Sequence, residues 1–241
     1  MPVWLPYCGS APDPGHWLAR WNFDPVLIIV AIALLGLGWW KHPATLRSQS
    51  CATALFAVIF ISPLCALGSA LFSIRAVHHL LLTLALAPLL VAAIGERAST
   101  FRPGLVPTTV VQAGVFWAWH FNPLYELALS NDAVFWAMQA SITLSAMAWW
   151  LALGRAASLV AAASTLATTI QMGLLGALLV FAGRPFYAPH WFSTQVWGLS
   201  PIEDQQIAGL VIWVLGSGAY LAIASALIFR ALTPSPRPAV A

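Results

Sequence analysis

Long apolar runs are the feature that most constrains what this chain can form. Seven such runs are separated by charged, proline or glycine residues, and they cover approximately residues 25–40, 51–73, 76–94, 106–121, 133–153, 157–182 and 201–229. About 20 apolar helical residues are needed to cross a hydrocarbon layer of about 30 Å. Apolar residues make up 61% of the chain and charged residues only 7%, more than a soluble core of this size can use. The sequence therefore predicts an all-α, polytopic membrane protein, with a bundle of seven transmembrane helices within residues 25–230.

The segments outside these runs are short. Residues 1–24 lack a positively charged start followed by an apolar core, so we expect no cleaved signal and a retained periplasmic segment. Residues 231–241 form a proline-rich end that we expect to be a disordered cytoplasmic tail. The first and fourth runs have only about 16 residues, near the lower limit for a span. Tryptophans at their ends would anchor them at the interfaces: Trp39, Trp40, Trp117 and Trp119.

Lysine and arginine residues set the expected orientation. Seven of them fall on the side that includes the C-terminal tail, namely Lys41, Arg47, Arg97, Arg102, Arg155, Arg230 and Arg237. Three fall on the opposite side, namely Arg20, Arg75 and Arg184. Because cytoplasmic loops carry the excess of positive charge, we expect the N-terminus outside and the C-terminus in the cytoplasm.

Cysteine spacing, charge and motifs exclude several classes of protein. The three cysteines, Cys8, Cys51 and Cys65, lie far apart without a CxxC spacing, which predicts neither a disulfide framework nor a zinc knuckle. A net charge of +3, scattered along the chain, does not indicate nucleic-acid binding. No Walker loop, nucleophile elbow or HExxH motif occurs, so we expect no enzyme.

Histidines and carboxylates gather on the side expected to face outward. Five of the six histidines fall there, namely His16, His78, His79, His120 and His190. Six of the seven carboxylates share that side, namely Asp13, Asp24, Glu126, Asp132, Glu203 and Asp204. Each residue alone is explained by an interfacial position, where its cost is low. Together they are the groups that a metal or proton site uses.

Three histidines are expected to lie at the same depth. His78 and His79 begin the third run, and His120 ends the fourth, where Pro123 stops the helix. Antiparallel neighbours would bring these positions level. Consecutive helical residues point about 100° apart, so only one of His78 and His79 can easily face a given helix.

Two soft donors extend the candidate metal set. Cys8 and Met138 are both expected near the outer side, and sulfur with imidazole suits copper(I) better than magnesium or calcium. Cys8 and His16 together could receive a metal before it enters the bundle. For Met138 the alternative is a core residue, since methionine commonly fills apolar gaps.

The segment GLSPIEDQQ predicts the start of the last helix. Ser200, Pro201 and Glu203 have the spacing of a capping box with proline at the first helical position. Asp204 in the same turn has two interpretations, a capping carboxylate or a member of a polar site.

Four segments carry a family resemblance: HHLLL with APLL, WHFNPLYELAL, LLGALLVFAGRPFYAPH and WGLSPIEDQQIAGLVIW. With them, the chain from Cys8 to about Arg230 resembles the multi-span cytochrome c oxidase assembly factors of the CtaG type. The resemblance implies a role in maturing haem-copper oxidases of the bacterial inner membrane, by delivering copper to the centre beside the high-spin haem. The implied partner is the oxidase subunit that carries this copper centre.

The resemblance also implies functional positions. Residues that match recurrent family positions are His79, His120, Tyr125, Asp204, Gln205 and Trp213. The chain departs from the family pattern at several positions. Relatives often have histidine where this chain has Arg75, methionine where it has Ile212 and proline where it has Leu215. Some also have a histidine near the start of the fifth run, where this chain has Trp136 and Met138.

Three functions are therefore considered. The first is an assembly factor that binds copper(I) through His79 and His120, with Cys8, His78 or Met138 as further ligands. In this function Asp204 would contact the ligands from behind or would relay ions. The second is a redox protein in which the same two histidines hold a b-type haem. The third is a proton- or ion-linked transporter that uses Asp204 and the histidines.

Overall fold

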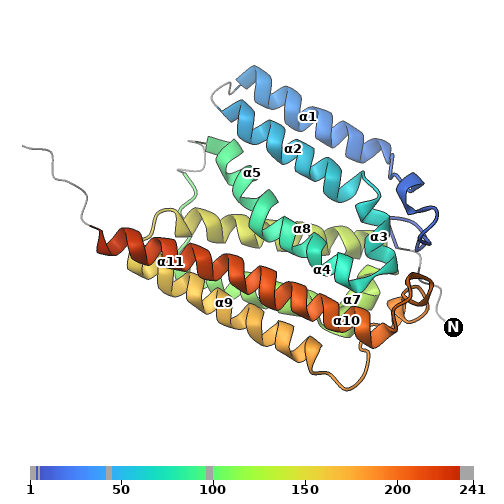
Figure 1. Ribbon diagram of the computed structural model, residues 1–241. Coiled ribbons are helices and arrows are strands. Elements are labelled where there is room, and N and C mark those ends of the chain that lie inside the picture. The colour runs from blue at the N-terminus through green and yellow to red at the C-terminus, as the bar shows by residue number, and fades with distance from the viewer. Residues whose placement is uncertain (1–3, 5, 42–44, 96–99, 234–241) are drawn as a thin grey trace, which may run out of the picture.

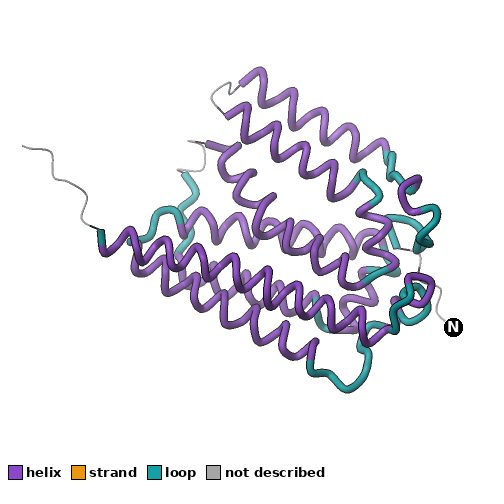
Figure 2. The backbone as a smooth tube through the Cα atoms, in the orientation of Figure 1, coloured by secondary structure: helices purple, strands orange, loops and turns teal. Residues whose placement is uncertain are grey.

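A computed structural model describes residues 4, 6–41, 45–95 and 100–233. For residues 37–41 it describes the backbone only. Helices and connecting loops account for all of this part of the chain (Figure 2). The α-helices are α1 (Pro25–Lys41), α2 (Leu46–Phe60), α3 (Leu64–Ala70), α4 (Phe72–Leu81), α5 (Ala87–Ile94), α6 (Leu105–Trp119), α7 (Asn122–Ala128), α8 (Asp132–Leu153), α9 (Ser158–Val180), α10 (Pro201–Leu210) and α11 (Gly218–Leu232). The all-helical prediction is confirmed.

Five helical stretches are long and apolar enough to cross a membrane. They are Leu46–Ala70, Phe72–Ile94, Asp132–Leu153, Ser158–Val180 and Pro201–Leu232. The two runs expected to be short fall on shorter apolar helices, Pro25–Gly36 and Leu105–Trp119. The protein is thus a membrane protein with five candidate spans, while the number seven and the orientation stay predictions.

Several predicted boundaries shift. The run expected at 51–73 begins at Leu46 and is interrupted between α2 and α3, where Pro63 lacks an amide to continue the helix. The last helix continues to Leu232, beyond the position where the tail was expected to begin. Residues 234–241 of the predicted tail lie outside the described residues.

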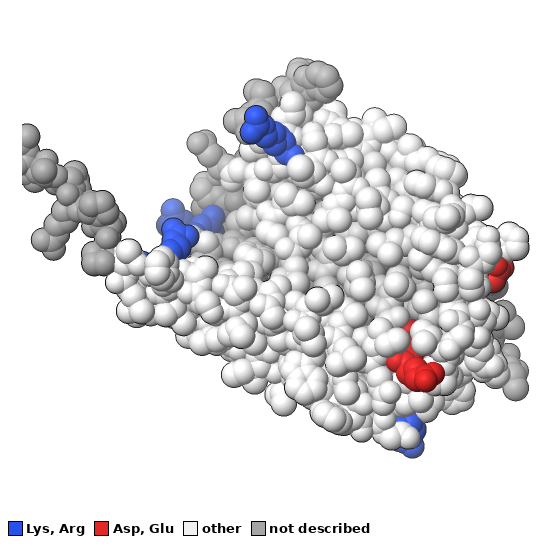
Figure 3. Space-filling model, viewed as in Figure 1, with Lys and Arg blue, Asp and Glu red and all other residues white. Residues whose placement is uncertain are grey.

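The helices run up and down in one bundle (Figure 1). Helices α1 and α2 form one edge, α9 and α11 form the other, and α4, α5 and α8 lie between them. Helices α3 and α7 and the first turns of α4 and α10 gather at the end of the bundle where η1 (Trp17–Ala19) lies; we call this the α3/α7/α10 end. On the visible face acidic groups lie toward this end, and most basic groups lie at the opposite end, where α11 terminates (Figure 3).

A π-helical turn, Leu82–Leu86, joins α4 to α5 and follows from Pro88. In a π turn the carbonyl of a residue bonds to the amide five positions later. For Thr83 that position is Pro88, which has no N–H. The indole Nε1 of Trp150 on α8 donates to the Thr83 carbonyl at 2.8 Å instead. The irregular turn is therefore satisfied by a neighbouring helix, as backbone at membrane depth requires.

Helices α9 and α10 cross closely at two glycines. A Cβ placed on Gly176 would lie 2.7 Å from the Gly209 carbonyl oxygen, and one on Gly209 would lie 2.8 Å from the Gly176 carbonyl oxygen. Small residues at a helix interface let the two backbones approach. The two helices therefore approach each other most closely at this pair of glycines.

The N-terminal segment is fastened to the bundle. A disulfide joins Cys8 to Cys65 on α3, so the prediction that the cysteines form no disulfide is wrong. Sequence spacing could not reveal the pair, because 57 positions separate the two residues and the fold alone brings them together. The Tyr7 hydroxyl also donates to Asp24, and the Trp197 indole donates to the Pro12 carbonyl at 3.0 Å.

Candidate functional site

Three histidines lie together near the α3/α7/α10 end of the bundle. His78 and His79 lie on α4, and His120 directly follows the last residue of α6. All three side chains are buried. The ring centres of His79 and His120 are 5.4 Å apart, and those of His78 and His79 are 6.1 Å apart. His79 and His120 therefore lie together as expected, although α6 packs mainly against α8 and α9 rather than against α4.

The two adjacent histidines face different neighbours, as their helical spacing predicted. The ring of His79 faces His120, whereas the ring of His78 packs edge-on against Phe60 of α2, with ring centres 5.2 Å apart. Gln139 of α8 also lies beside His78. His79 is thus the member of the pair that can share a ligand with His120.

Most nitrogens of these imidazoles have no hydrogen-bond partner. The Nδ1 atom of His120 lies 2.7 Å from the Phe116 carbonyl oxygen, which fixes the ring. Its Nε2 atom, and both ring nitrogens of His78 and of His79, are buried without a partner. A buried polar atom that lacks a partner costs free energy, so such a cluster calls for a ligand or another explanation.

The spacing allows one ion to contact His79 and His120. On each side of the ion, a nitrogen–metal bond of about 2 Å adds to about 1 Å between the nitrogen and its ring centre, so the two ring centres can lie up to about 6 Å apart. The observed 5.4 Å falls within this reach. Within the described part of the chain, no group of three or more His, Cys, Asp or Glu residues is arranged to hold a metal. The two imidazoles would therefore form an incomplete ligand set.

Cys8 does not join the histidines as a thiolate. It is buried and disulfide-bonded to Cys65, whereas the sequence predicted no disulfide. A cysteine binds a metal ion through its deprotonated thiol, and a cysteine in a disulfide has no thiol to deprotonate. His16, its expected companion, is exposed and pairs with Asp13 through Nδ1 at 2.9 Å. The relay from Cys8 and His16 into the bundle is therefore not supported in the disulfide-bonded protein.

Met138 lies within the packed core of the bundle. Its side chain is fully buried on α8, next in sequence to Gln139, the residue beside His78. Burial of this kind fits the gap-filling role of methionine as well as a ligand role. Its place among the copper ligands stays a prediction.

Asp204 caps a neighbouring helix. Its carboxylate accepts hydrogen bonds from the Phe72 amide at 2.6 Å, the Ser73 amide at 3.2 Å and the Ser73 hydroxyl at 2.5 Å. Phe72 and Ser73 begin α4, where the first amides of a helix have no partner within the helix. The predicted capping box of α10, between Ser200 and Glu203, is confirmed. Of the two interpretations of Asp204, the structure supports capping, but of α4 rather than of its own helix.

The amides that follow Asp204 hold the loop between α9 and α10. Gln205 accepts from the Phe186 amide through Oε1 at 2.6 Å and donates to the Leu179 carbonyl at 3.3 Å. Gln206 donates to the Val180 carbonyl at 3.2 Å. The polar residues of the EDQQ segment thus position this loop against the bundle.

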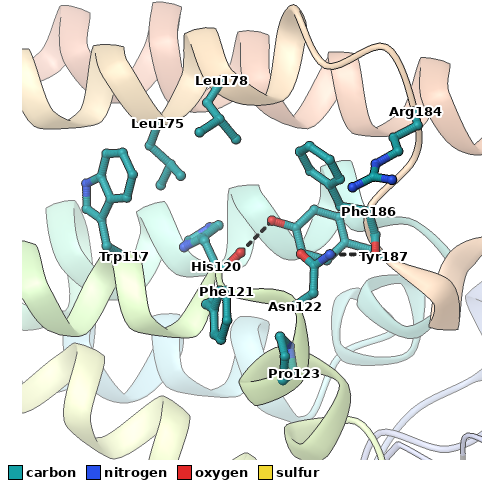
Figure 4. A pocket seen from close by; sticks show the side chains of 10 residues that line it. All are labelled: Trp117, His120, Phe121, Asn122, Pro123, Leu175, Leu178, Arg184, Phe186 and Tyr187. Atoms are coloured by element: carbon teal, nitrogen blue, oxygen red, sulfur yellow. Dashed lines mark hydrogen bonds between the residues drawn. The ribbon is translucent and has the colours of Figure 1, made fainter.

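A pocket of about 420 Å³ lies between α6, α9 and this loop. His120 lies at its border, Leu175 and Leu178 form an apolar wall, and Arg184 lies on the loop side (Figure 4). The Tyr187 hydroxyl donates to the His120 carbonyl at 2.9 Å across this space. Since Leu178 is exposed, the pocket opens on the outside of the bundle beside His120.

Two further polar residues, which the sequence analysis did not assign to the site, are buried near the histidines. His190, in the loop before α10, lies with Nε2 at 2.7 Å from the Tyr125 hydroxyl of α7. Arg75 is fully buried on α4, one turn before His79. The orientation count treated Arg75 as an exposed loop residue, and the helix begins four residues earlier than expected, at Phe72. This earlier start is what turns Arg75 into the bundle.

The pH dependence of stability is expected to depend on His190. Burial, together with the charge of Arg75, lowers the pKa of His190 to about 3. In the unfolded chain this pKa is about 6.5, so between pH 6.5 and 3 the unfolded state binds the additional proton and folding weakens as the pH falls. We expect the loss to approach about 1.4 kcal/mol per pH unit in that range. Melting of the detergent-purified protein at pH 7 and pH 5 measures it.

The control for this prediction is His190→Gln, which keeps a polar partner for Tyr125 but does not titrate. We expect the difference in melting temperature between pH 7 and pH 5 to shrink in the variant. An equal difference in both proteins would show that other groups cause the acid sensitivity.

Comparison with known families decides the identity of the chain. A family model described as the cytochrome c oxidase caa3 assembly factor matches residues 39–233. The chain belongs to this family. No curated protein and no solved structure gives a significant match.

The matched region of this caa3 assembly factor contains the three clustered histidines and Asp204, and it begins after Cys8. The family role agrees with the expectation of a factor for oxidase assembly, with the oxidase as its partner, and suggests a non-enzymatic role.

Proposed function

We propose that this caa3 assembly factor binds one copper(I) ion between His79 and His120, near the outer face of the bacterial inner membrane. From this site the ion passes to the oxidase subunit that carries the copper centre. The single observation that supports it most is the pair of buried imidazoles with ring centres 5.4 Å apart and unpartnered nitrogens.

The chemistry of the cluster is compatible with copper(I). Neutral imidazole is a ligand for copper, and no carboxylate is grouped with the histidines in the described residues. Asp204, the one buried carboxylate in the described part of the chain, is already bonded to the start of α4. Copper bound here would have only neutral nitrogen ligands from this chain.

An incomplete ligand set favours transfer over storage. With two imidazoles from the factor, further donors would come from the partner, so the ion could exchange ligands without first being released. The pocket beside His120 opens on the outside of the bundle, where a membrane-embedded partner would lie. The oxidase subunit would reach the ion from that side.

The two alternatives have less support. A haem held by His79 and His120 would need a flat cavity that both residues border, yet the pocket beside His120 is not lined by His79. A transporter that uses Asp204 would need a carboxylate free to exchange ions, and this one is bonded to three donors.

Anaerobic titration of the purified protein against a copper(I) competitor tests the proposal. We expect one equivalent of copper(I) to bind the wild type and the affinity of the His79→Ala/His120→Ala variant to fall at least a hundredfold. His16→Ala is the matched control, because His16 is exposed and distant in sequence from the cluster. Equal affinities in the wild type and the double variant would overturn the proposal.

A cellular experiment tests delivery. In a deletion strain complemented with His120→Ala, we expect the oxidase to be made with less copper than in a strain complemented with the wild type. Full copper content of the oxidase in the variant strain would show that oxidase assembly does not depend on copper binding at His120.

A further inference from the structure

Arg75 is a buried cation on α4, the helix whose first turn is capped by the buried Asp204 carboxylate. Its side chain has no exposed surface, and it lies on α4 three and four positions before the two adjacent histidines. No carboxylate among the described residues forms an ion pair with Arg75. Buried charges are normally paired, because removal from water is costly.

The contacts of Arg75 hold its position but leave its charge in place. The Nε atom donates to the Gly68 carbonyl at 3.2 Å, and the guanidinium lies over the Phe135 ring, 5.4 Å from its centre. The two terminal nitrogens are buried, and the Tyr125 hydroxyl lies near the guanidinium. A carbonyl, an aromatic face and a nearby tyrosine hydroxyl stabilise a cation without neutralising it.

The charge acts directly on the histidine cluster. Residues three and four positions apart on a helix have Cβ atoms about 5–6 Å apart, so His78 and His79 are the nearest helical neighbours of Arg75. Arg75, His78 and His79 are all fully buried on this helix, so little water separates the guanidinium from the two imidazoles. Any cation that binds the cluster is therefore repelled by a fixed positive charge.

We propose that Arg75 makes the histidine cluster select monovalent over divalent metal ions. Repulsion by a fixed charge doubles, in free-energy terms, when the ion carries two charges rather than one. At an effective dielectric constant of about 20 and a separation up to about 10 Å, each unit of charge lowers affinity about tenfold or more.

This selectivity answers a problem that the cluster alone would have. Grouped imidazoles are typical zinc ligands, and divalent zinc and copper bind nitrogen sites tightly. A carboxylate in the cluster would favour divalent ions further, and none is grouped with the histidines in the described residues. Arg75 adds a penalty that falls most heavily on the divalent competitors. The inference rests on the proposed copper(I) function.

Competition titrations of the full-length protein with zinc(II) and with copper(I), under anaerobic conditions, test it. We expect Arg75→Gln to raise the zinc(II) affinity at least tenfold more than it raises the copper(I) affinity. In Arg75→Lys the charge is kept while the planar fork is lost, so we expect the ratio of the two affinities to stay within threefold of the wild type. A purely structural role of Arg75 would instead make the lysine variant behave like the glutamine variant.

A second route neutralises the charge and keeps Arg75. Phe135→Glu places a carboxylate where the ring under the guanidinium lies, and we expect the same shift toward zinc(II) as in Arg75→Gln. An unchanged ratio in a folded neutralised variant, or a wild type that binds zinc(II) more tightly than copper(I), would overturn the inference. Failure of the wild type to bind copper(I) at all would instead overturn the proposed function.

Discussion

Asp204→Ala is expected to destabilise the protein by about 3–5 kcal/mol, a large part of the stability of a typical domain. The substitution leaves the amides of Phe72 and Ser73 buried without an acceptor, and each unsatisfied buried donor costs about 1–3 kcal/mol. It also removes the tie between α10 and the start of α4. Melting of the detergent-purified variant, with the yield of folded protein in the membrane, measures the effect.

Glu203→Ala is the matched control for this result. Glu203 is the adjacent carboxylate, but it is exposed and takes part in the capping box of its own helix. Loss of a cap costs about 1 kcal/mol, so this variant is expected to fold. An Asp204→Ala protein that melts like the wild type and yet loses copper(I) would contradict the capping role and point to Asp204 as a direct participant.

Gly176→Ala is expected to have the second large effect. Its new Cβ would lie 2.7 Å from the Gly209 carbonyl oxygen and 2.9 Å from the Trp213 amide nitrogen, atoms of backbone that cannot turn aside. Helices α9 and α10 would have to separate, and overpacking of this kind costs about 1–3 kcal/mol or more. Thermal melting and resistance to proteolysis are the measurements.

Gly114→Ala on α6 is the matched control, because the same substitution is expected to change stability in the opposite direction there. Nothing lies within 4 Å of a Cβ at Gly114. Glycine within a helix is less favourable than alanine by about 1 kcal/mol, so this variant should match or exceed the wild type in stability. Stabilisation by both substitutions would show that the α9–α10 crossing is looser than described.

The helical fold follows largely from hydrophobic patterning. Each of the seven apolar runs falls on helix, because a chain in lipid must satisfy its own backbone hydrogen bonds and the helix does so locally. The interruption near Pro63 and the π turn before Pro88 depend on local geometry and on Trp150, a residue 67 positions from the carbonyl that it satisfies. Apolar runs alone carry no signal for such a partner.

The candidate site was predictable in part. The depth of His79 and His120 follows from their positions at the ends of two antiparallel runs, and the structure brings them together. The pairing of Cys8 with Cys65 does not follow from the sequence, because it depends on how a segment without regular patterning folds back on α3. Arg75 was assigned to a loop, since charged residues are usually taken to mark the limits of a span.

The disulfide between Cys8 and Cys65 also bears on how the protein is made. The bond encloses α1 and α2, so it can close only after this pair of helices has folded back on itself. Disulfides persist where thiols can be oxidised, which in the bacterial inner membrane proposed above would be the periplasmic side. That favours the orientation expected from the lysine and arginine residues on independent chemical grounds. The bond forms by oxidation of two thiols, and it lies at the same end of the bundle as the clustered histidines.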